Sequence, residues 1–411
     1  MSFPEEQMTD TEERAMPLIY TIGLVSFILC FMEIELSWSY PASPFKYLSF
    51  ASLTLHLLNW IQQYSGRQLL MLAFAFIIVV IVGHNAQQMS LLYLSFALVV
   101  GAKGIDYEQI LKVCFITGFS ICLISVIGSW LGIIENKVFH LSADSMVMMG
   151  ASSSVRYSYG YGWPTGCGIH ISYVCLTYWL LRKGLLNWKE LSFILFAFWF
   201  TFSINKSRQA SLIILLMILF SLYLKYCDWR QRVPSKLFLK SLIIAIPLFA
   251  ILSMYASIAY DDGDISWVAL NLIFSTRLSL GQDAIEQYGI PWLGQYVLMV
   301  GGDANSFDYN YVDSSYVQAY LLWGIVLTTA LVVFFCMMCV SAYKRRDVAF
   351  LLAVLFAGLS SISSQYLFQI MHCPLLLALF ARHINSIDTN ENLQDYDEEG
   401  RIETANIETN S

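Results

Sequence analysis

The chain has 411 residues, of which 57% are hydrophobic and only 13% are charged, and its formal net charge is −7. A soluble globular domain carries about twice that share of charged residues. The composition therefore excludes an ordinary soluble enzyme. The nine cysteines lie mostly inside apolar stretches and do not form the framework of a disulfide-rich domain.

The apolar residues occur in long blocks that predict an all-α, polytopic membrane protein. Blocks such as residues 211–224 and 242–258 carry no polar stripe. Alone or with a few flanking residues, each can cross the ~30 Å hydrocarbon layer, and backbone groups in lipid favour helices because they must bond within their own segment. We expect about twelve transmembrane helices, near residues 17–33, 44–62, 68–84, 87–102, 110–134, 165–182, 190–204, 209–226, 241–258, 316–341, 347–362 and 366–382.

The distribution of Lys and Arg predicts that both termini are cytoplasmic. We expect a cytoplasmic N-terminus (1–16), a transmembrane bundle (17–386) and an acidic, disordered cytoplasmic tail (387–411). With this layout, seventeen of the 23 Lys and Arg residues fall on the inner face, where such an excess is expected. The six on the outer face are Lys46, Lys137, Arg156, Lys206, Arg208 and Arg277.

Two large outer loops, near residues 135–164 and 259–315, are where we expect function, because long ordered loops usually carry it. Within the second loop, residues 277–288 place their apolar side chains on one helical face. This pattern predicts an amphipathic helix that packs on the bundle or lies at the membrane interface. We find no internal repeat, and no pair of Gly- or Pro-broken spans of the kind that marks many transporters.

Three arginines stand out on an outer face that is otherwise poor in positive charge. Arg156 precedes the sixth predicted span, Arg208 lies between the seventh and eighth, and Arg277 lies in the second loop. A guanidinium stays charged and offers a planar fork of donors to phosphate oxygens. We expect the three to converge on phosphate. Any one of them alone is better explained by snorkelling to lipid headgroups or by pairing with a loop carboxylate.

The end of the second loop carries a candidate catalytic carboxylate. Asp313 and Tyr316 share a face if the tenth span begins near them. Asp313 suits a general base that takes a proton from an acceptor hydroxyl, and it suits the N-cap of that span equally well. No residues have metal-ligand spacing, and no phosphate-binding glycine loop or nucleophile elbow is present, so we expect neither metal nor cofactor.

Four segments, taken in order, resemble the Wzy-type polymerases that extend O-antigen and capsular polysaccharides, a family related to the O-antigen ligases. The resemblance runs from roughly Arg156 to Gly324, and the expected span number agrees over the rest. The segments are VRYSYGYGWP (155–164), NKSRQASLIILL (205–216), STRLSLGQDAIEQYGIPWLGQ (275–295) and VDSSYVQAYLLWGI (312–325).

The resemblance implies a glycosyltransferase of the bacterial inner membrane. Such an enzyme moves a growing glycan from polyprenyl pyrophosphate to a hydroxyl of the next lipid-linked repeat unit, at the outer face. By position, Asp313 and Arg277 would be catalytic, and Arg156, Arg208 and Tyr316 would bind substrate. The expected partners are the polyprenyl-pyrophosphate-linked oligosaccharide, membrane lipid, a chain-length regulator and a flippase, with no nucleic acid.

Three alternatives stay open. The first is an O-antigen-type ligase. In that family, activity is associated with a histidine in the large loop. Residues 259–315 contain no histidine, and this difference favours a polymerase. The second is a flippase or transporter of the lipid-linked oligosaccharide, which should show charges or broken helices at mid-membrane depth. The third is a scaffold or sensor whose outer loops bind a partner protein.

Overall fold

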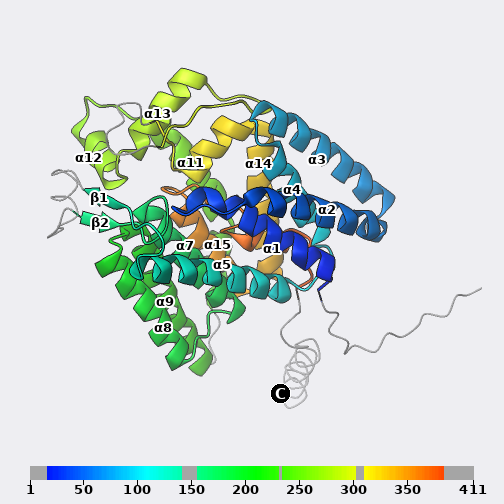
Figure 1. The fold of residues 1–411 in the computed structure, drawn as a ribbon, viewed down its shortest axis with the longest axis horizontal. Coiled ribbons are helices and arrows are strands. Elements are labelled where there is room, and N and C mark those ends of the chain that lie inside the picture. The colour runs from blue at the N-terminus through cyan, green and yellow to red at the C-terminus, as the bar shows by residue number, and fades with distance from the viewer. Residues whose placement is uncertain (1–15, 141–154, 231–233, 302–309, 384–411) are drawn as a thin grey trace, which may run out of the picture.

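The computed structural model describes residues 16–140, 155–230, 234–301 and 310–383 (Figure 1). Its helices are α1 (Leu18–Met32), α2 (Ala42–Trp60), α3 (Gly66–Asn85), α4 (Met89–Gly101), α5 (Tyr107–Trp130), α7 (Pro164–Leu181), α8 (Trp188–Trp199), α9 (Arg208–Trp229), α10 (Lys236–Ile243), α11 (Ala245–Ile258), α12 (Ile265–Ile273), α13 (Arg277–Tyr288), α14 (Ser315–Lys344) and α15 (Val348–Ser360). Strands β1 (Val138–His140) and β2 (Val155–Tyr157) form an antiparallel hairpin. The expected tail 387–411 and, apart from Met16, the expected N-terminal segment 1–16 lie outside the described residues.

Within these residues, five helices are long and apolar enough to cross a membrane, or six if the bent pair α10 and α11 counts as one. The five are Leu18–Glu35 (α1 with the short 3-10 helix Glu33–Glu35), α3, α5, α9 and α14. Helices α4 and α15 are apolar but shorter. The chain is therefore mostly helical with several candidate membrane spans, as expected for an all-α membrane protein.

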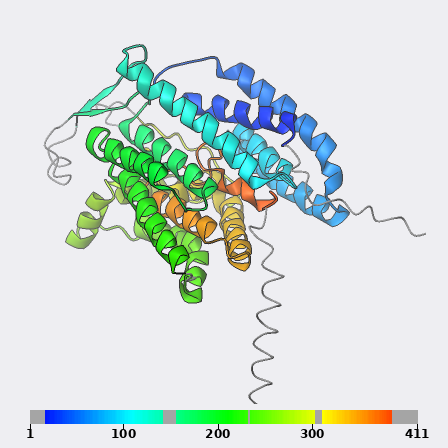
Figure 2. The same cartoon turned by 90° about the horizontal axis from the view of Figure 1, so that it is seen from below.

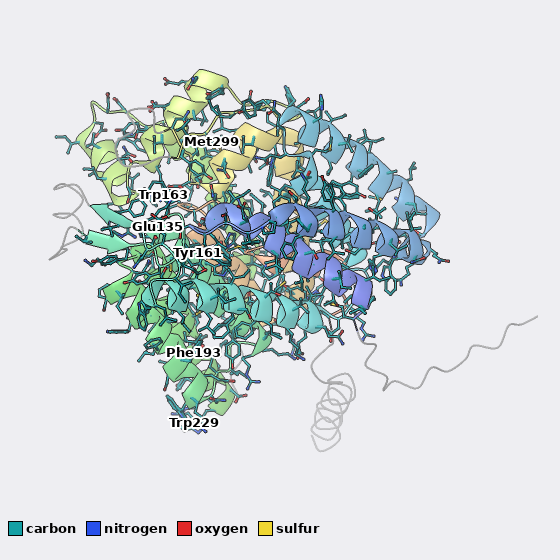
Figure 3. All side chains as sticks on the ribbon, viewed as in Figure 1. Glu135, Tyr161, Trp163, Phe193, Trp229 and Met299 are labelled. Carbon is teal, nitrogen blue, oxygen red and sulfur yellow. The ribbon has the colours of Figure 1, made fainter. Side chains whose placement is uncertain are left out.

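The side chains on the circumference of the helix bundle are largely apolar, as a lipid-facing surface should be. On α3, Leu70 is 74% exposed and Phe74 is 67% exposed. Phe193 on α8 and Trp229 at the end of α9 also face outward (Figure 3). Seen from below, α8 and α9 lie side by side, and the β1–β2 hairpin extends from the end of α5 (Figure 2).

The last predicted span, residues 366–382, is wrong as a helix. After α15 ends at Ser360, the chain runs through turns and then a 3-10 helix, Pro374–Leu379. Serine hydroxyls at 360–364 compete for backbone carbonyls, as when Ser364 Oγ donates to Ser360 O at 3.0 Å, and Pro374 disfavours a helix just before it. The chain nevertheless returns to the start of α5, where Arg382 N donates to Ile105 O at 2.7 Å.

The tenth predicted span is broken, contrary to our expectation of uninterrupted spans. Gly324 in α14 has φ +80° and ψ 178°, a conformation open essentially to glycine alone. The segment after α13 fills the break: Ile325 N donates to Pro291 O at 2.9 Å and Val326 N donates to Trp292 O at 3.1 Å. Two of the N–H groups freed by the break are thereby paired inside the protein, as a helix that crosses lipid would require.

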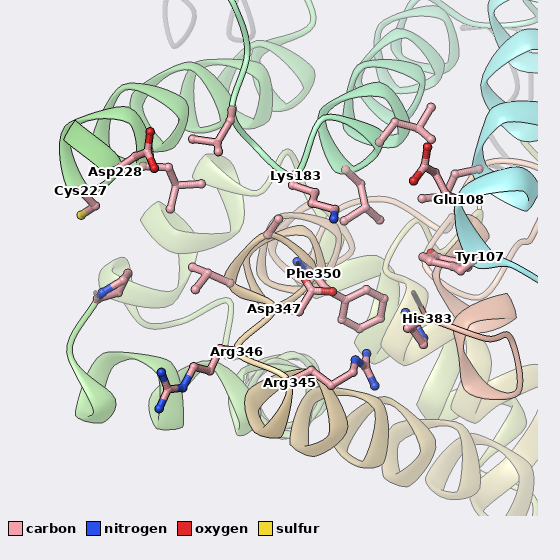
Figure 4. A pocket seen from close by; sticks show the side chains of 18 of the residues that line it. Tyr107, Glu108, Lys183, Cys227, Asp228, Arg345, Arg346, Asp347, Phe350 and His383 are labelled. Atoms are coloured by element: carbon pink, nitrogen blue, oxygen red, sulfur yellow. Dashed lines mark hydrogen bonds between the residues drawn. The ribbon is translucent and has the colours of Figure 1, made fainter. Parts of the chain in front are cut away.

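One end of the bundle gathers the turns that we predicted on the inner face. A cavity of about 350 Å³ there is lined by residues of several separate turns, among them Asp106. Lys183, Asp228, Asp347 and His383, which also line it, are labelled in Figure 4. The turns join α4 to α5, α7 to α8, α9 to α10 and α14 to α15. The helices between these turns therefore run antiparallel, and the three outer arginines lie at the opposite end.

Candidate functional site

Arg277 is held by a tight turn between α12 and α13. It is the first residue of α13, and the two residues before it, Ser275 and Thr276, have φ of 56° and 65°. The left-handed region is unusual for a β-branched residue such as Thr276. The buried side chain of Asn271 stabilises the turn, since its Oδ1 accepts from Leu278 N at 3.0 Å. Strained backbone of this kind is concentrated at functional sites.

Arg277 forms an ion pair with Asp313, which lies just before the first residue of α14. The distance between Arg277 Nη2 and Asp313 Oδ2 is 2.8 Å, and the two side chains are only 16% and 28% exposed. Burial raises the pKa of Asp313, and the positive charge of Arg277 partly opposes that rise. The N-cap explanation of Asp313 is wrong: Ser314 is the N-cap of α14 and makes no side-chain capping bond. Asp313 instead joins the chain just before α14 to the first residue of α13.

Arg156 lies on β2, opposite Phe139 on β1. Its Nε and Nη2 atoms are buried and have no hydrogen-bond partner, and the Nε of Arg277 is in the same state. Burial, followed by the positive charges of Arg208 and Arg277, lowers the pKa of Arg156 to about 10. The charges of Arg208 and Arg277 are therefore close enough to act on Arg156, and the expected convergence of all three on phosphate stays a prediction. Buried donors without partners are rare in native proteins and call for an explanation.

Arg208 is the exposed member of this group and opens α9. The loop before it is fixed to the start of α7, because Asn205 Nδ2 donates to Pro164 O at 2.9 Å. Gly168 allows this approach, since a Cβ there would lie 2.4 Å from the Cβ of Ser207. Helices α9 and α13 thus begin at Arg208 and Arg277, and a helix N-terminus adds a favourable field for anions.

Glu35 is a second carboxylate of the site, and our sequence reasoning missed it. Its Oε2 accepts from the hydroxyl of Tyr366 at 3.0 Å, and its Oε1 accepts from Gln365 Nε2 at 3.5 Å. Glu35 lies near enough to Asp313 for their negative charges to interact. The available signal was two glutamates, Glu33 and Glu35, directly after the first apolar block on the arginine-bearing face.

The structure does not bring Tyr316 to this cluster. Its ring is fully buried, and its hydroxyl donates to Gly358 O at 3.0 Å, which joins α14 to α15. A substrate could not reach this hydroxyl without opening that helix contact. The predicted substrate contact of Tyr316 is therefore replaced by a packing role. Arg156, Arg208, Arg277, Asp313 and Glu35 form what we call the arginine–carboxylate cluster.

The cluster places guanidinium groups beside two carboxylates. Partly desolvated guanidinium groups stabilise negative charge more strongly than they would in water. A carboxylate whose pKa is raised towards neutrality is a better proton acceptor at neutral pH than an ordinary one. In the described part of the chain, no three His, Cys, Asp or Glu residues lie together in a way that could hold a metal ion.

Comparison with known proteins adds no relative: no protein-family model, no curated protein and no solved structure matches this chain.

Proposed function

We propose that this chain is a polysaccharide polymerase. It transfers a growing glycan from polyprenyl pyrophosphate to a hydroxyl of the next lipid-linked repeat unit, at the outer face of a bacterial inner membrane. The observation that carries the proposal is the convergence of Arg156, Arg208 and Arg277 beside Asp313, with buried guanidinium nitrogens that have no partner. A pyrophosphate would supply acceptors for those nitrogens.

In the proposed reaction, the oxygen of the acceptor hydroxyl attacks the anomeric carbon of the sugar joined to the carrier. The bond between that carbon and the phosphate oxygen breaks, and polyprenyl pyrophosphate leaves with the electron pair. Asp313 accepts the proton of the attacking hydroxyl. The arginines stabilise the charge that gathers on the leaving pyrophosphate, and removing one such donor typically costs about 10²–10³ in rate.

The proposal places the cluster outside and both termini in the cytoplasm. Seventeen of the 23 basic residues then lie at the inner face, as the positive-inside tendency favours. The turns around the cavity of Figure 4 contribute Lys183, Arg345 and Arg346 to that face. About twelve crossings of the membrane remain our proposed topology, with the segment after α15 crossing as irregular chain. Fusions of a reporter at residues 135–164 and 259–315 should report both as external.

The decisive experiment is glycan chain length in a strain that depends on this protein. We expect Arg156→Ala, Arg277→Ala and Asp313→Ala each to leave single repeat units on the lipid carrier or core, at unchanged protein level. Lys46→Ala is the matched control, because Lys46 belongs to the same predicted outer face but lies outside the cluster. Long chains in all three variants would refute the proposal.

A flippase for the same lipid-linked unit is the second candidate, and one observation favours it. Transporters commonly bind their substrates at discontinuous helices, and α14 is broken at Gly324. The same strains separate the two functions. A failed flippase leaves lipid-linked units on the inner leaflet, whereas a failed polymerase leaves them on the outer leaflet. The O-antigen-type ligase predicts a third outcome, long chains on carrier that never reach the acceptor core.

A further inference from the structure

A separate cavity of about 370 Å³ lies beside the arginine–carboxylate cluster. Its walls come from the turn between α3 and α4, the first part of α14, residues 365–369, and the segment at 296–299 that follows α13. Met299, at this wall, lies next to α14 (Figure 3). The volume falls within the range of about 300–1,000 Å³ that is usual for small-ligand sites.

The lining of this cavity mixes apolar residues with polar, uncharged ones. Among the described residues, no Asp, Glu, Lys, Arg or His lines it, and its polar side chains are five amides, the hydroxyl of Ser315 and the polar groups of aromatic residues. We call it the glutamine pocket, after Gln87, Gln88, Gln318, Gln365 and Gln369, which line it together with Tyr296, Tyr311 and Trp323. Its chemistry therefore contrasts with that of the neighbouring cluster, which is built from charged groups.

Several of these amides are held in place by other protein groups. Trp323 Nε1 donates to Gln88 Oε1 at 2.9 Å, and Gln318 Nε2 donates to Gln365 Oε1 at 3.0 Å and to Val312 O at 3.1 Å. The Oε1 of Gln369 is different, because it is buried and has no hydrogen-bond partner. An unpaired buried acceptor is unfavourable in the empty protein and becomes favourable when a ligand donates to it.

We propose that the glutamine pocket binds a short, uncharged stretch of glycan through its hydroxyl groups. Amides can donate to and accept from hydroxyls, and aromatic rings can pack against the apolar faces of a sugar. A phosphate or carboxylate ligand would enter this pocket without a cation to neutralise it, which is costly. A neutral polyol suits both the amides and the free acceptor of Gln369.

The pocket joins the cluster through a line of hydrogen bonds. The hydroxyl of Tyr311 donates to Gln365 Oε1, and Gln365 Nε2 in turn contacts Glu35 at 3.5 Å. Tyr311 is also only two residues before Asp313. Resting on the proposed polymerase function, this placement identifies the bound sugar as part of the acceptor repeat unit. Its reacting hydroxyl would face the carboxylates, and the donor pyrophosphate would lie among the arginines.

The test measures sugar binding apart from catalysis. The full chain is reconstituted in nanodiscs and titrated with the host's repeat-unit oligosaccharide, released from its lipid by mild acid and therefore free of pyrophosphate. We expect saturable binding that Gln369→Leu weakens at least tenfold. Gln287→Leu is the matched control, because Gln287 is exposed on α13 away from the pocket. Arg156→Ala should leave the affinity unchanged, because the probe carries no phosphate.

A thermal melt of the same variants excludes simple misfolding. Gln369→Leu removes an unpaired buried oxygen and should leave the melting temperature unchanged or slightly raised. Equal affinity in Gln369→Leu and wild type, or no saturable binding by wild type, would overturn the proposal. So would an affinity that depends on Arg156 and not on Gln369. Sugar binding in a protein that does not polymerise would refute the proposed function while leaving the pocket intact.

Discussion

The junction at Gly324 offers the sharpest test of the architecture around the site. A Cβ at Gly324 would lie 2.7 Å from Gly294 N and from Pro291 O, and its φ is +80°. We expect Gly324→Ala to strain the backbone by about 1–3 kcal/mol and to push away the segment that follows α13. Three backbone hydrogen bonds join that segment to α14, from Ile325 N, Val326 N and Gln295 N.

Each of these hydrogen bonds contributes about 0.5–1.5 kcal/mol net. Together with the backbone strain, we expect a loss of roughly 2.5–7.5 kcal/mol in the free energy of unfolding. Gly289→Ala is the matched control: Gly289 has φ 67° and ψ −176°, nearly the same conformation, but a Cβ there would meet nothing within 4 Å. It should lose only the strain, about 1–3 kcal/mol.

The measurement is unfolding of the purified protein in mixed micelles at rising SDS fraction, followed by tryptophan fluorescence. The difference between the two alanine variants isolates the contacts at the junction from the backbone conformation. Gly324→Ala should also shorten the glycan, because the displaced segment forms one wall of the glutamine pocket and follows directly on α13. If Gly324→Ala proved no less stable than Gly289→Ala, the junction would not be a structural contact and this reasoning would fail.

Three further predictions concern the cluster. In SDS unfolding, Arg277→Ala should destabilise the protein by about 1 kcal/mol more than the double variant Arg277→Ala/Asp313→Ala does, because the single change leaves a half-buried carboxylate unpaired. If the effects of the two substitutions were strictly additive, the ion pair would be contradicted. Because burial raises the pKa of Asp313, polymerisation rate should fall on acidification at a higher pH than an ordinary aspartate allows. The contribution of Asp313 to the free energy of unfolding should be fully present below the pKa that Asp313 has in the unfolded chain, and it should be lost as the pH rises through the higher pKa of the folded state. Rate and stability profiles that show neither change would refute the raised pKa of Asp313. Asn271→Ala should cost about 1 kcal/mol by uncapping α13 and reduce glycan length, whereas Ser43→Ala, at an exposed site near Lys46, should change neither.

Much of the helical layout was predictable because lipid leaves the backbone little choice. Apolar blocks of sufficient length form helices such as α3 and α9 close to the predicted residues. The break at Gly324 was not predictable in this way, since a single glycine in an apolar run is compatible with a continuous helix. What breaks α14 is contact with Pro291 and Trp292, which lie in a different part of the chain. Tertiary contacts of this kind leave no local pattern.

The cluster was predictable in part for a similar reason. Positive charge is rare on the predicted outer face, so Arg156, Arg208 and Arg277 could be singled out by their scarcity, and in the structure the charges of Arg208 and Arg277 act on Arg156. Glu35 lies beside an apolar block and looks like an ordinary helix end. Its partner Tyr366 begins the last stretch that we predicted as a span, and its partner Gln365 directly precedes that stretch. Helical spacing also suggested that Tyr316 accompanies Asp313, but Asp313 precedes the helix and the spacing does not apply.

The unpaired guanidinium nitrogens of Arg156 have a practical consequence for handling the protein. On our proposal an anion accepts hydrogen bonds from these nitrogens in the folded state, and any molecule that binds only the folded state stabilises it by mass action. Extraction into a detergent that removes phosphate-bearing lipids should therefore shorten the time for which the purified protein stays folded. Phosphate or pyrophosphate in the purification buffer should restore it.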